Sequence, residues 1–193
     1  MSTEQSCQTA GRVLTGFKDF AIEDKGLIES YTKTWNLDCS DLSFANLFIW
    51  GADGKMQYTI YDDVLFIKLD FSGYPEYFWP PMPKKGSRYD YESLVKLVFE
   101  YLEDKGVKPY IRNIWEPFRE IIEKTCPWLE ITPTDISWDY VYTREKLAEL
   151  KGKKLHGKRN HINKFIEEHP DFVYKKLDPS MYDECIAVYD EWK

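Results

Sequence analysis

The chain has 193 residues, of which 43% are hydrophobic and 17% aromatic, and its 26 basic and 33 acidic residues give a formal net charge of −7. These values argue against an intrinsically disordered chain and allow one packed domain with an extension. No apolar run approaches the ~20 residues that cross a bilayer, and the N-terminal residues lack the apolar segment of a signal peptide. We therefore expect a cytoplasmic protein without a membrane span.

Alternating apolar residues predict strands in the first part of the chain. Phe17–Ile22 is expected to be a short edge strand. Met56–Tyr61 and Val64–Phe71 are expected to form a hairpin around a turn at Asp62 and Asp63.

Four helices are predicted within the first 125 residues. Asp24 is a candidate N-cap for the first, and Phe44–Trp50 is interpreted as the second, with a buried strand as the alternative. Asp90 caps a helix over residues 90–105, and Trp115–Lys124 is the fourth.

Further short apolar runs are interpreted as strands. They are Tyr77–Trp79, Lys108–Ile111, Leu129–Ile131, Ile136–Tyr142 and Phe172–Leu177.

The order of elements predicts an α/β fold with a mixed central sheet and helices on both faces. This is the order of the GNAT-like (N-acetyltransferase-like) fold. The strand at 172–177 is followed by a helix that opens at Asp178 and Pro179. This pair repeats the opening of the chain and indicates the first of a tandem pair of domains. The apolar stripe of the last helix is unfinished at Lys193, so we expect a second domain to continue beyond it.

The segment Lys151–Ile166 concentrates positive charge. It carries six basic residues and no acid, and the rest of the chain has 20 basic against 33 acidic residues, a net charge of −13. Such a patch attracts polyanions while the remaining surface repels them. On a helical wheel Leu155, Ile162 and Ile166 form one narrow apolar seam.

The candidate polyanion-binding residues lie in this segment. Arg, Asn and His bind phosphate oxygens through directed hydrogen bonds, which a solubilising lysine run does not need. The alternative is a solvated linker helix with a chance cluster of charge. For His161 three roles stay open, a general base, a phosphate contact and a plain surface residue. The candidates are Lys151, Lys153, Lys154, Lys158, Arg159, Asn160, His161 and Lys164.

No cofactor or metal site is predicted. The four cysteines form no CxxC pair, and the three histidines do not stand at ligand spacing from them. There is no Gly-x-Gly turn of the kind that holds the pyrophosphate of acetyl-CoA. Four aromatic residues near loops are candidates to stack a base or an acyl group, although core packing is favoured for Trp50 and Trp79. The four are Trp50, Tyr74, Tyr77 and Trp79.

Two stretches carry a family resemblance. DLSFANLFIW at Asp41–Trp50 and WDYVYTREKLAELKGKKLHGKRNHINKF at Trp138–Phe165 resemble the phosphatidylglycerol lysyltransferase C-terminal-domain family. The resemblance covers nearly the whole chain from Phe17 onward. It implies two GNAT-like domains joined by a positively charged helix. In the best-understood members an aminoacyl group passes from a charged tRNA to a lipid head group.

The resemblance divides the chain into a polar leader (1–16), a first GNAT-like domain (17–150), a basic joining helix (151–169) and the start of a second GNAT-like domain (170–193). The transmembrane module of the best-understood members has no counterpart in this sequence, so the acceptor stays open, and no catalytic residue is carried over.

Three functions are therefore weighed. The first is an acyltransferase-like activity of the aminoacyl-tRNA-dependent type. The alternative is a non-catalytic module whose basic helix recognises tRNA, other nucleic acid or an anionic surface. The third is a scaffold for the second domain. The oligomeric state is not predicted.

Overall fold

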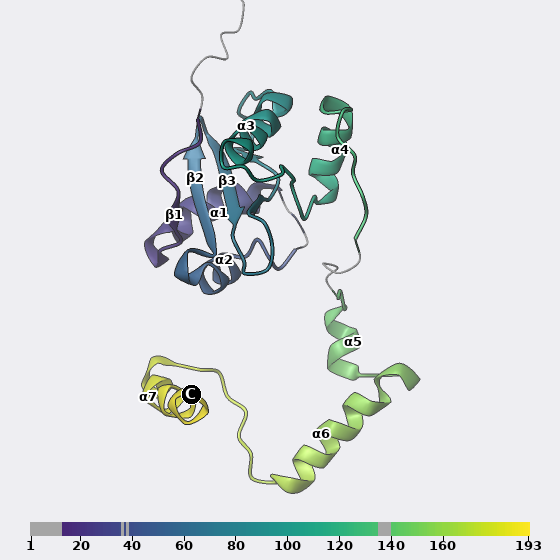
Figure 1. Cartoon of the computed structure of the whole chain (residues 1–193). Helices are drawn as coiled ribbons and strands as arrows, with labels where there is room; N and C mark the ends of the chain where they lie inside the picture. The colour runs from purple at the N-terminus through teal and green to yellow at the C-terminus, as the bar shows by residue number, and fades with distance from the viewer. Residues whose placement is uncertain (1–12, 36, 38, 135–139) are drawn as a thin grey trace, which may run out of the picture. The chain divides into compact units, whose positions relative to one another are not determined.

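The computed structural model describes residues 13–35, 37, 39–134 and 140–193. The chain divides into two compact units, unit 1 over Met1–Asp139 and unit 2 over Tyr140–Lys193 (Figure 1). The predicted leader, GNAT-like domains and joining helix remain predictions.

Unit 1 is built on a five-stranded sheet. Its strand order is β1-β2-β3-β4, with β5 also paired to β3, and these pairs are antiparallel. A parallel bridge joins Phe78 to Ile111. The strands are β1 (Lys18–Asp19), β2 (Met56–Tyr61), β3 (Val64–Leu69), β4 (Tyr77–Phe78) and β5 (Met82–Pro83).

The predicted hairpin is confirmed as β2 and β3. Tyr61 pairs with Val64, and the two residues between them, Asp62 and Asp63, have φ angles of 51° and 57°. Two successive positive φ angles are what a type I′ turn requires, and this turn matches the twist of the flanking strands. The edge strand at 17–22 is shorter than predicted, because Ile22 begins a 3₁₀ turn.

All four predicted helices of unit 1 form. The run Phe44–Trp50 is a helix, because the Ser43 side chain accepts a hydrogen bond from the Asn46 backbone N–H and caps its first turn. The helices are α1 (Lys25–Thr32), α2 (Phe44–Trp50), α3 (Tyr91–Asp104) and α4 (Glu116–Thr125), and short 3₁₀ turns lie at Ile22–Asp24, Lys33–Trp35 and Ala52–Gly54.

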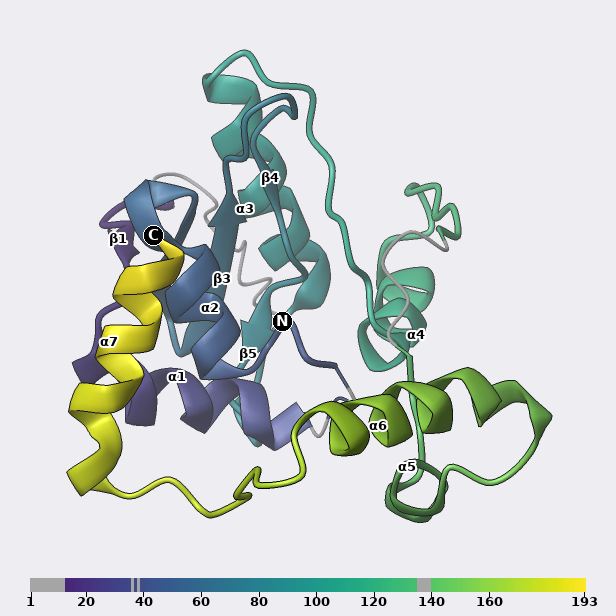
Figure 2. The ribbon, with the colours of Figure 1, turned by 90° about the horizontal axis from the view of Figure 1, so that it is seen from below.

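Helices cover both faces of the sheet, as predicted. Met56, Leu69 and Tyr77 are paired across β2, β3 and β4 and so share one face. Phe78 points to the opposite face, where its ring meets Tyr101 of α3 edge-on at 5.4 Å between centroids. Helix α3 therefore covers that face, and α1 and α2 lie on the other side of the strands (Figure 2). The α/β class is confirmed, and the GNAT-like topology remains a prediction.

Several predicted strands do not form. Ile111 contributes only its bridge to Phe78, and 129–131 follows a turn in which the Leu129 N–H donates to the Cys126 carbonyl. In 136–142 only residues 140–142 are described, and they are not a strand. Residues 172–177 are exposed without strand pairing. A short apolar run becomes a strand only where a neighbour accepts its hydrogen bonds.

Unit 2 consists of helices and connecting segments. The predicted start of its last helix is confirmed, because the Asp178 carboxylate accepts from the Ser180 N–H at 2.9 Å and Pro179 occupies the first turn. The six-residue α5 was not predicted. The elements are α5 (Arg144–Glu149), a 3₁₀ turn (Lys153–Leu155), α6 (His156–Glu168), a 3₁₀ turn (Pro179–Met181) and α7 (Tyr182–Trp192).

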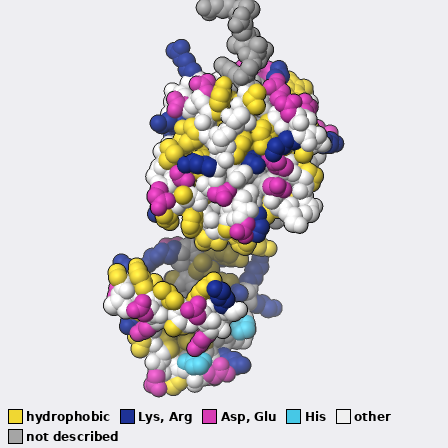
Figure 3. Space-filling view, turned by 60° about the vertical axis from the view of Figure 1, so that its left-hand side comes forward, with side chains coloured by type: hydrophobic (Ala, Val, Ile, Leu, Met, Phe, Trp, Pro, Cys, Tyr) yellow, Lys and Arg dark blue, Asp and Glu magenta, His cyan; other side chains and the backbone are white. Residues whose placement is uncertain are grey.

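The apolar stripes of unit 2 lie at its surface. Ile162 and Ile166 on the predicted seam of α6 are 48% and 45% exposed, and Trp192 of α7 is 89% exposed. Figure 3 shows hydrophobic side chains, in yellow, on the surface of the unit that carries the cyan histidines. None of the described residues of unit 2 is buried, so this unit has no core of its own.

Glu76 links the sheet to the end of α3 through two ion pairs. Its carboxylate lies 2.8 Å from Lys105 Nζ and 3.4 Å from Lys68 Nζ, and its side chain is 11% exposed. Burial acts to raise the pKa of Glu76, but the Lys105 hydrogen bond and the Lys68 charge outweigh it and lower the pKa below 4.5. The ion pairs therefore stabilise the fold above that pH, and their contribution is lost as the pH falls through the lowered pKa.

We predict that Glu76→Gln lowers the free energy of unfolding by about 1–3 kcal/mol at neutral pH. The difference from the wild type should shrink below pH 4.5, the ordinary pKa of this carboxyl. Urea unfolding at a series of pH values measures both effects. Glu23→Gln, at an exposed carboxyl, is the control and should stay close to the wild type. A deficit of the Glu76 variant that is the same at every pH would contradict the prediction.

Candidate functional site

Three lysines at the start of α6 form the lysine cluster, defined as Lys153, Lys154 and Lys158. The 3₁₀ turn at Lys153–Leu155 places the first two directly before α6, and Lys158 lies in its first turn. All three are exposed and have no ion-pair partner among the described residues. The amide dipoles of a helix sum to a partial positive charge at its N-terminus. The cluster therefore adds to positive potential that is already present.

The other two predicted lysines have acidic neighbours. Lys151 Nζ lies 2.9 Å from a carboxylate oxygen of Glu149, and Lys164 Nζ lies 3.6 Å from one of Glu168. These side chains are more than half exposed, so each pair contributes little to stability. The pairing does reduce the net positive charge at both ends of the predicted segment.

Arg159 holds a turn of the chain. Its guanidinium donates to the carbonyl of Leu150 and, at 3.1 Å, to that of Gly152. Leu150 and Gly152 have φ angles of 48° and 92°, and these left-handed residues turn their carbonyls toward the guanidinium. Arg159 thus joins the end of α5 to the start of α6, a role that the sequence analysis missed.

The remaining predicted residues differ in their contacts. Asn160 Nδ2 lies 3.3 Å from Nε2 of His156, whose other ring nitrogen lies 3.4 Å from the Arg159 guanidinium. His161 is exposed and has no hydrogen-bond partner in the described part of the chain. Polyanion binding by these residues remains a prediction.

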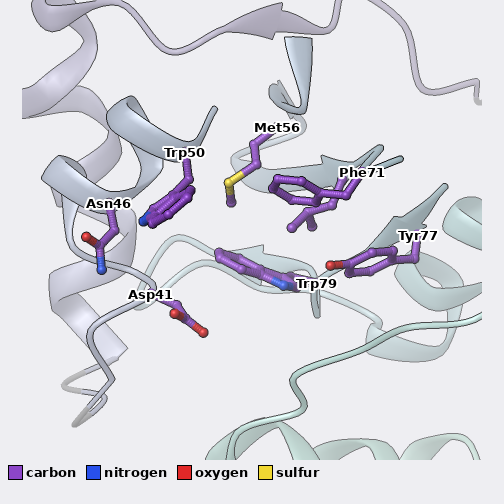
Figure 4. A pocket seen from close by; sticks show the side chains of 8 residues that line it. Asp41, Asn46, Trp50, Met56, Phe71, Tyr77 and Trp79 are labelled. Carbon is purple, nitrogen blue, oxygen red and sulfur yellow. The ribbon is translucent and has the colours of Figure 1, made fainter. Parts of the chain in front are cut away.

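Unit 1 contains a second candidate site, a pocket of about 230 Å³ called here the aromatic pocket (Figure 4). The shared face of β2, β3 and β4 supplies one wall. Asn46 and Trp50, four residues apart on α2, supply the facing wall. The lining residues are Asp41, Asn46, Trp50, Met56, Leu69, Phe71, Tyr77 and Trp79.

The polar groups of the aromatic pocket differ in their surroundings. Asp41 accepts a hydrogen bond of 3.3 Å from Asn113 Nδ2, and Asn46 Nδ2 donates to the Ser40 carbonyl at 2.8 Å. The indole N–H of Trp79 is buried and has no hydrogen-bond acceptor among the described residues. The Tyr77 hydroxyl points toward Trp79 (Figure 4).

Tyr77 also contacts two residues that do not line the pocket, Tyr110 and Arg112. Its ring stacks on Tyr110 at 5.6 Å, and the Arg112 guanidinium lies 5.1 Å from its centroid. Burial raises the pKa of Tyr77, the Arg112 charge opposes this, and the nearby Asp41 charge adds to it. The Tyr77 hydroxyl therefore stays protonated at neutral pH. Arg112 itself is not among the described residues that line the pocket.

The predicted aromatic candidates separate. Trp79 is 4% exposed, which confirms core packing, whereas Trp50 is 63% exposed and core packing was wrong for it. Only Phe44 and Leu47 of α2 are buried, and Trp50 projects from the last turn over the pocket. Tyr74 is 59% exposed and does not line the pocket.

Within the described residues no group of three or more His, Cys, Asp or Glu side chains is placed to hold a metal ion. No helix among these described residues is long and apolar enough to cross a membrane.

Comparisons with known proteins give one family and one solved structure. A family described as phosphatidylglycerol lysyltransferase, C-terminal, matches residues 33–193. The crystal structure of a conserved protein of unknown function from Bacteroides thetaiotaomicron VPI-5482 is similar, with a TM-score of 0.73 and 29% sequence identity. The likeness covers 93% of this chain and 59% of that one, so this chain spans less than two thirds of that protein. No curated protein sequence matches.

We predict that Arg159→Ala loosens the turn between α5 and α6, because two carbonyls lose a charged donor. Charged hydrogen bonds contribute about 1.5–3 kcal/mol each, so local opening should become easier by at least tenfold, or about 1.4 kcal/mol. Amide hydrogen exchange at residues 150–155 measures this opening. Lys158→Ala, on the same helix, should leave exchange unchanged, and equal exchange in both variants would contradict the role of Arg159.

Proposed function

The chain belongs to the phosphatidylglycerol lysyltransferase C-terminal family, and we propose that it takes part in aminoacyl transfer in the cytoplasm with a charged tRNA as donor. Membership supports an acyl- or aminoacyltransferase-like function in general. The lysine cluster of α6 supports the identity of the donor, because tRNA is a polyanion.

The observation that best supports this proposal is the order of charges along α6, with basic residues at its start and acidic residues at its end. The lysine cluster lies at its N-terminal end, and Glu167 and Glu168 lie in its last turn. A helix favours acids at its N-terminus and bases at its C-terminus, by about 0.3–1 kcal/mol for each charge. This arrangement opposes that preference at both ends, and an anion bound at the N-terminal end offsets the cost.

The charge of the remaining chain limits where a polyanion can bind. Outside Lys151–Ile166 the chain has 20 basic and 33 acidic residues. A polyanion is therefore repelled by most of the protein and attracted to the lysine cluster. Solubility alone does not account for the cluster, because a chain with net charge −7 is already far from neutral.

In the proposed reaction an amine or hydroxyl of the acceptor attacks the ester that joins the amino acid to tRNA. The ester bond breaks, and the tRNA leaves with its free hydroxyl. Holding the donor and acceptor together accounts for much of the rate enhancement in such reactions. The lysine cluster positions the donor, and none of the described residues is assigned to the chemical step.

We predict that the triple variant Lys153→Glu, Lys154→Glu, Lys158→Glu loses measurable tRNA binding. Each lost phosphate contact flattens the salt dependence of log K by roughly 0.7–0.9. Arg159 stays intact in this variant because it holds the turn before α6. Filter binding with charged tRNA at several salt concentrations measures both quantities.

The matched control is Lys84→Glu, Lys85→Glu, Lys108→Glu, three exposed lysines of unit 1. It changes the net charge by the same amount and should keep most of the binding. If both triple variants bind tRNA equally well at low salt, the lysine cluster is not the donor site.

Transfer of a labelled amino acid separates an enzyme from a binding module. We expect label from charged tRNA to appear in the acceptor when the protein is present, and to be reduced at least about tenfold by the lysine-cluster variant at subsaturating tRNA. Phosphatidylglycerol vesicles and a mixture of soluble amines are tested as acceptors. Binding of tRNA with no transfer to either would favour the non-catalytic module.

A further inference from the structure

We propose that Arg112 of unit 1 binds the oxyanion of a small ligand, a carboxylate or phosphate group, beside the exposed ring of Tyr74. Arg112 lies in unit 1, and the lysine cluster lies in unit 2. This proposal therefore does not rest on tRNA as the donor.

The backbone at Arg112 is attached to the sheet. Its N–H donates to the Phe78 carbonyl at 3.0 Å, and the preceding residue, Ile111, forms the parallel bridge to Phe78. Phe78 belongs to β4 and is buried. The sheet therefore fixes the point from which the Arg112 side chain extends, although Arg112 itself lies in a connecting segment.

Two tyrosine rings hold the Arg112 side chain. The guanidinium carbon lies 5.4 Å from the centroid of the Tyr74 ring and 5.1 Å from that of the Tyr77 ring. Tyr77 in turn stacks on Tyr110, whose hydroxyl donates to the Pro75 carbonyl at 3.3 Å. A freely moving arginine side chain loses rotamer entropy when it binds a ligand. The ring contacts restrict Arg112 before a ligand arrives, so less entropy is lost on binding.

The guanidinium N–H groups of Arg112 have no acceptor in the described part of the chain. Arg112 and Arg159 are partly buried, whereas the other described arginines are exposed. Arg159 donates to two backbone carbonyls, but the Arg112 side chain forms no hydrogen bond or ion pair with described residues. A tyrosine ring attracts the guanidinium charge but is a weak hydrogen-bond acceptor. The N–H groups of Arg112 therefore remain available to an external acceptor.

The guanidinium determines the chemistry of the ligand. It stays charged at physiological pH, and its planar fork of N–H groups matches the paired oxygens of a carboxylate or phosphate. A cationic ligand would be repelled, and a neutral apolar ligand would satisfy none of the donors. The Tyr74 ring is 59% exposed and lies against the guanidinium. A ligand with a flat ring beside its oxyanion can therefore contact both residues.

The test compares two oxyanions with a neutral compound of similar shape. Phenyl phosphate and benzoate are the oxyanions, and benzyl alcohol is the neutral compound. We expect the oxyanions to bind and benzyl alcohol to bind at least about tenfold more weakly, because only the oxyanions accept charged hydrogen bonds. Isothermal titration of the full chain at low ionic strength gives the affinities. Binding of only one oxyanion would identify the preferred group. No saturable binding of either, or equal affinity for benzyl alcohol, would overturn the proposal.

Substitutions locate the site. Arg112→Gln should weaken binding of the oxyanion by about tenfold or more, and Arg112→Lys should also weaken it, because an ammonium group lacks the planar fork. The matched control is Arg119→Gln, which removes the same charge from an arginine of unit 1 that is paired with Glu116 and Glu123. The control should keep the affinity of the wild type.

The lysine-cluster triple variant separates this site from the proposed tRNA site. It should keep the affinity for the small oxyanion, whether or not it loses tRNA binding. A loss of oxyanion affinity in this variant or in Arg119→Gln equal to that in Arg112→Gln would show a general effect of charge and would overturn the proposal.

The proposal stays testable if Arg112→Gln fails to fold, which circular dichroism detects. Tyr74 is exposed, so Tyr74→Leu spares the core and removes one of the two rings that hold the guanidinium. Tyr74→Leu should therefore weaken oxyanion binding. Unchanged affinity in a folded Arg112→Gln, or in Tyr74→Leu where Arg112→Gln does not fold, would show that the oxyanion binds elsewhere.

Discussion

The register of the β2–β3 hairpin is the constraint on which unit 1 depends. Residues Val64–Ile67 of β3 are each at most 2% exposed, so both faces of this strand are covered. Because side chains alternate, a slip of one residue would move every side chain to the opposite face. A slip of β3 would remove Leu69 from the aromatic pocket and Phe66 from the face under α3. The Asp62-Asp63 turn prevents this slip, since only one pairing is compatible with a two-residue connection.

The two units are stabilised in different ways. Unit 1 has a continuous core in which aromatic residues from distant segments meet. The rings of Phe118 of α4 and Trp35, for example, have their centroids 4.5 Å apart. The described part of unit 2 has no buried residue and relies on local hydrogen bonds, those of Arg159 with two carbonyls and of Asp178 with Ser180. The positively charged side chains of the basic segment therefore have two different roles. Arg159 orders the chain, and the lysine cluster faces solvent.

Local patterns predicted the parts of the fold that local interactions determine. The hairpin and the four helices of unit 1 follow from the periodicity of their apolar residues. The cap of α2 at Ser43 was not predicted and is seen only in the structure. The strands at 129–131 and 172–177 were wrong because their formation depends on a partner strand that the sequence does not reveal. At the sites, the basic segment and the aromatic residues were visible in the sequence. The role of Arg159 was not, because it depends on left-handed conformations at Leu150 and Gly152. The alignment of Met56, Leu69 and Tyr77 under Trp50 likewise depends on strand register.

The separation of charge along the chain also affects the kinetics of encounter. Under the proposed function, the acidic remainder of the chain repels a polyanionic partner and the lysine cluster attracts it, so unproductive orientations are disfavoured before contact. Fields of this kind raise association rates by roughly 10- to 1,000-fold, and the gain falls steeply as ionic strength rises. Under the proposed function, the position of Lys153, Lys154 and Lys158 would set the orientation in which a polyanionic partner arrives as well as the strength with which it is held.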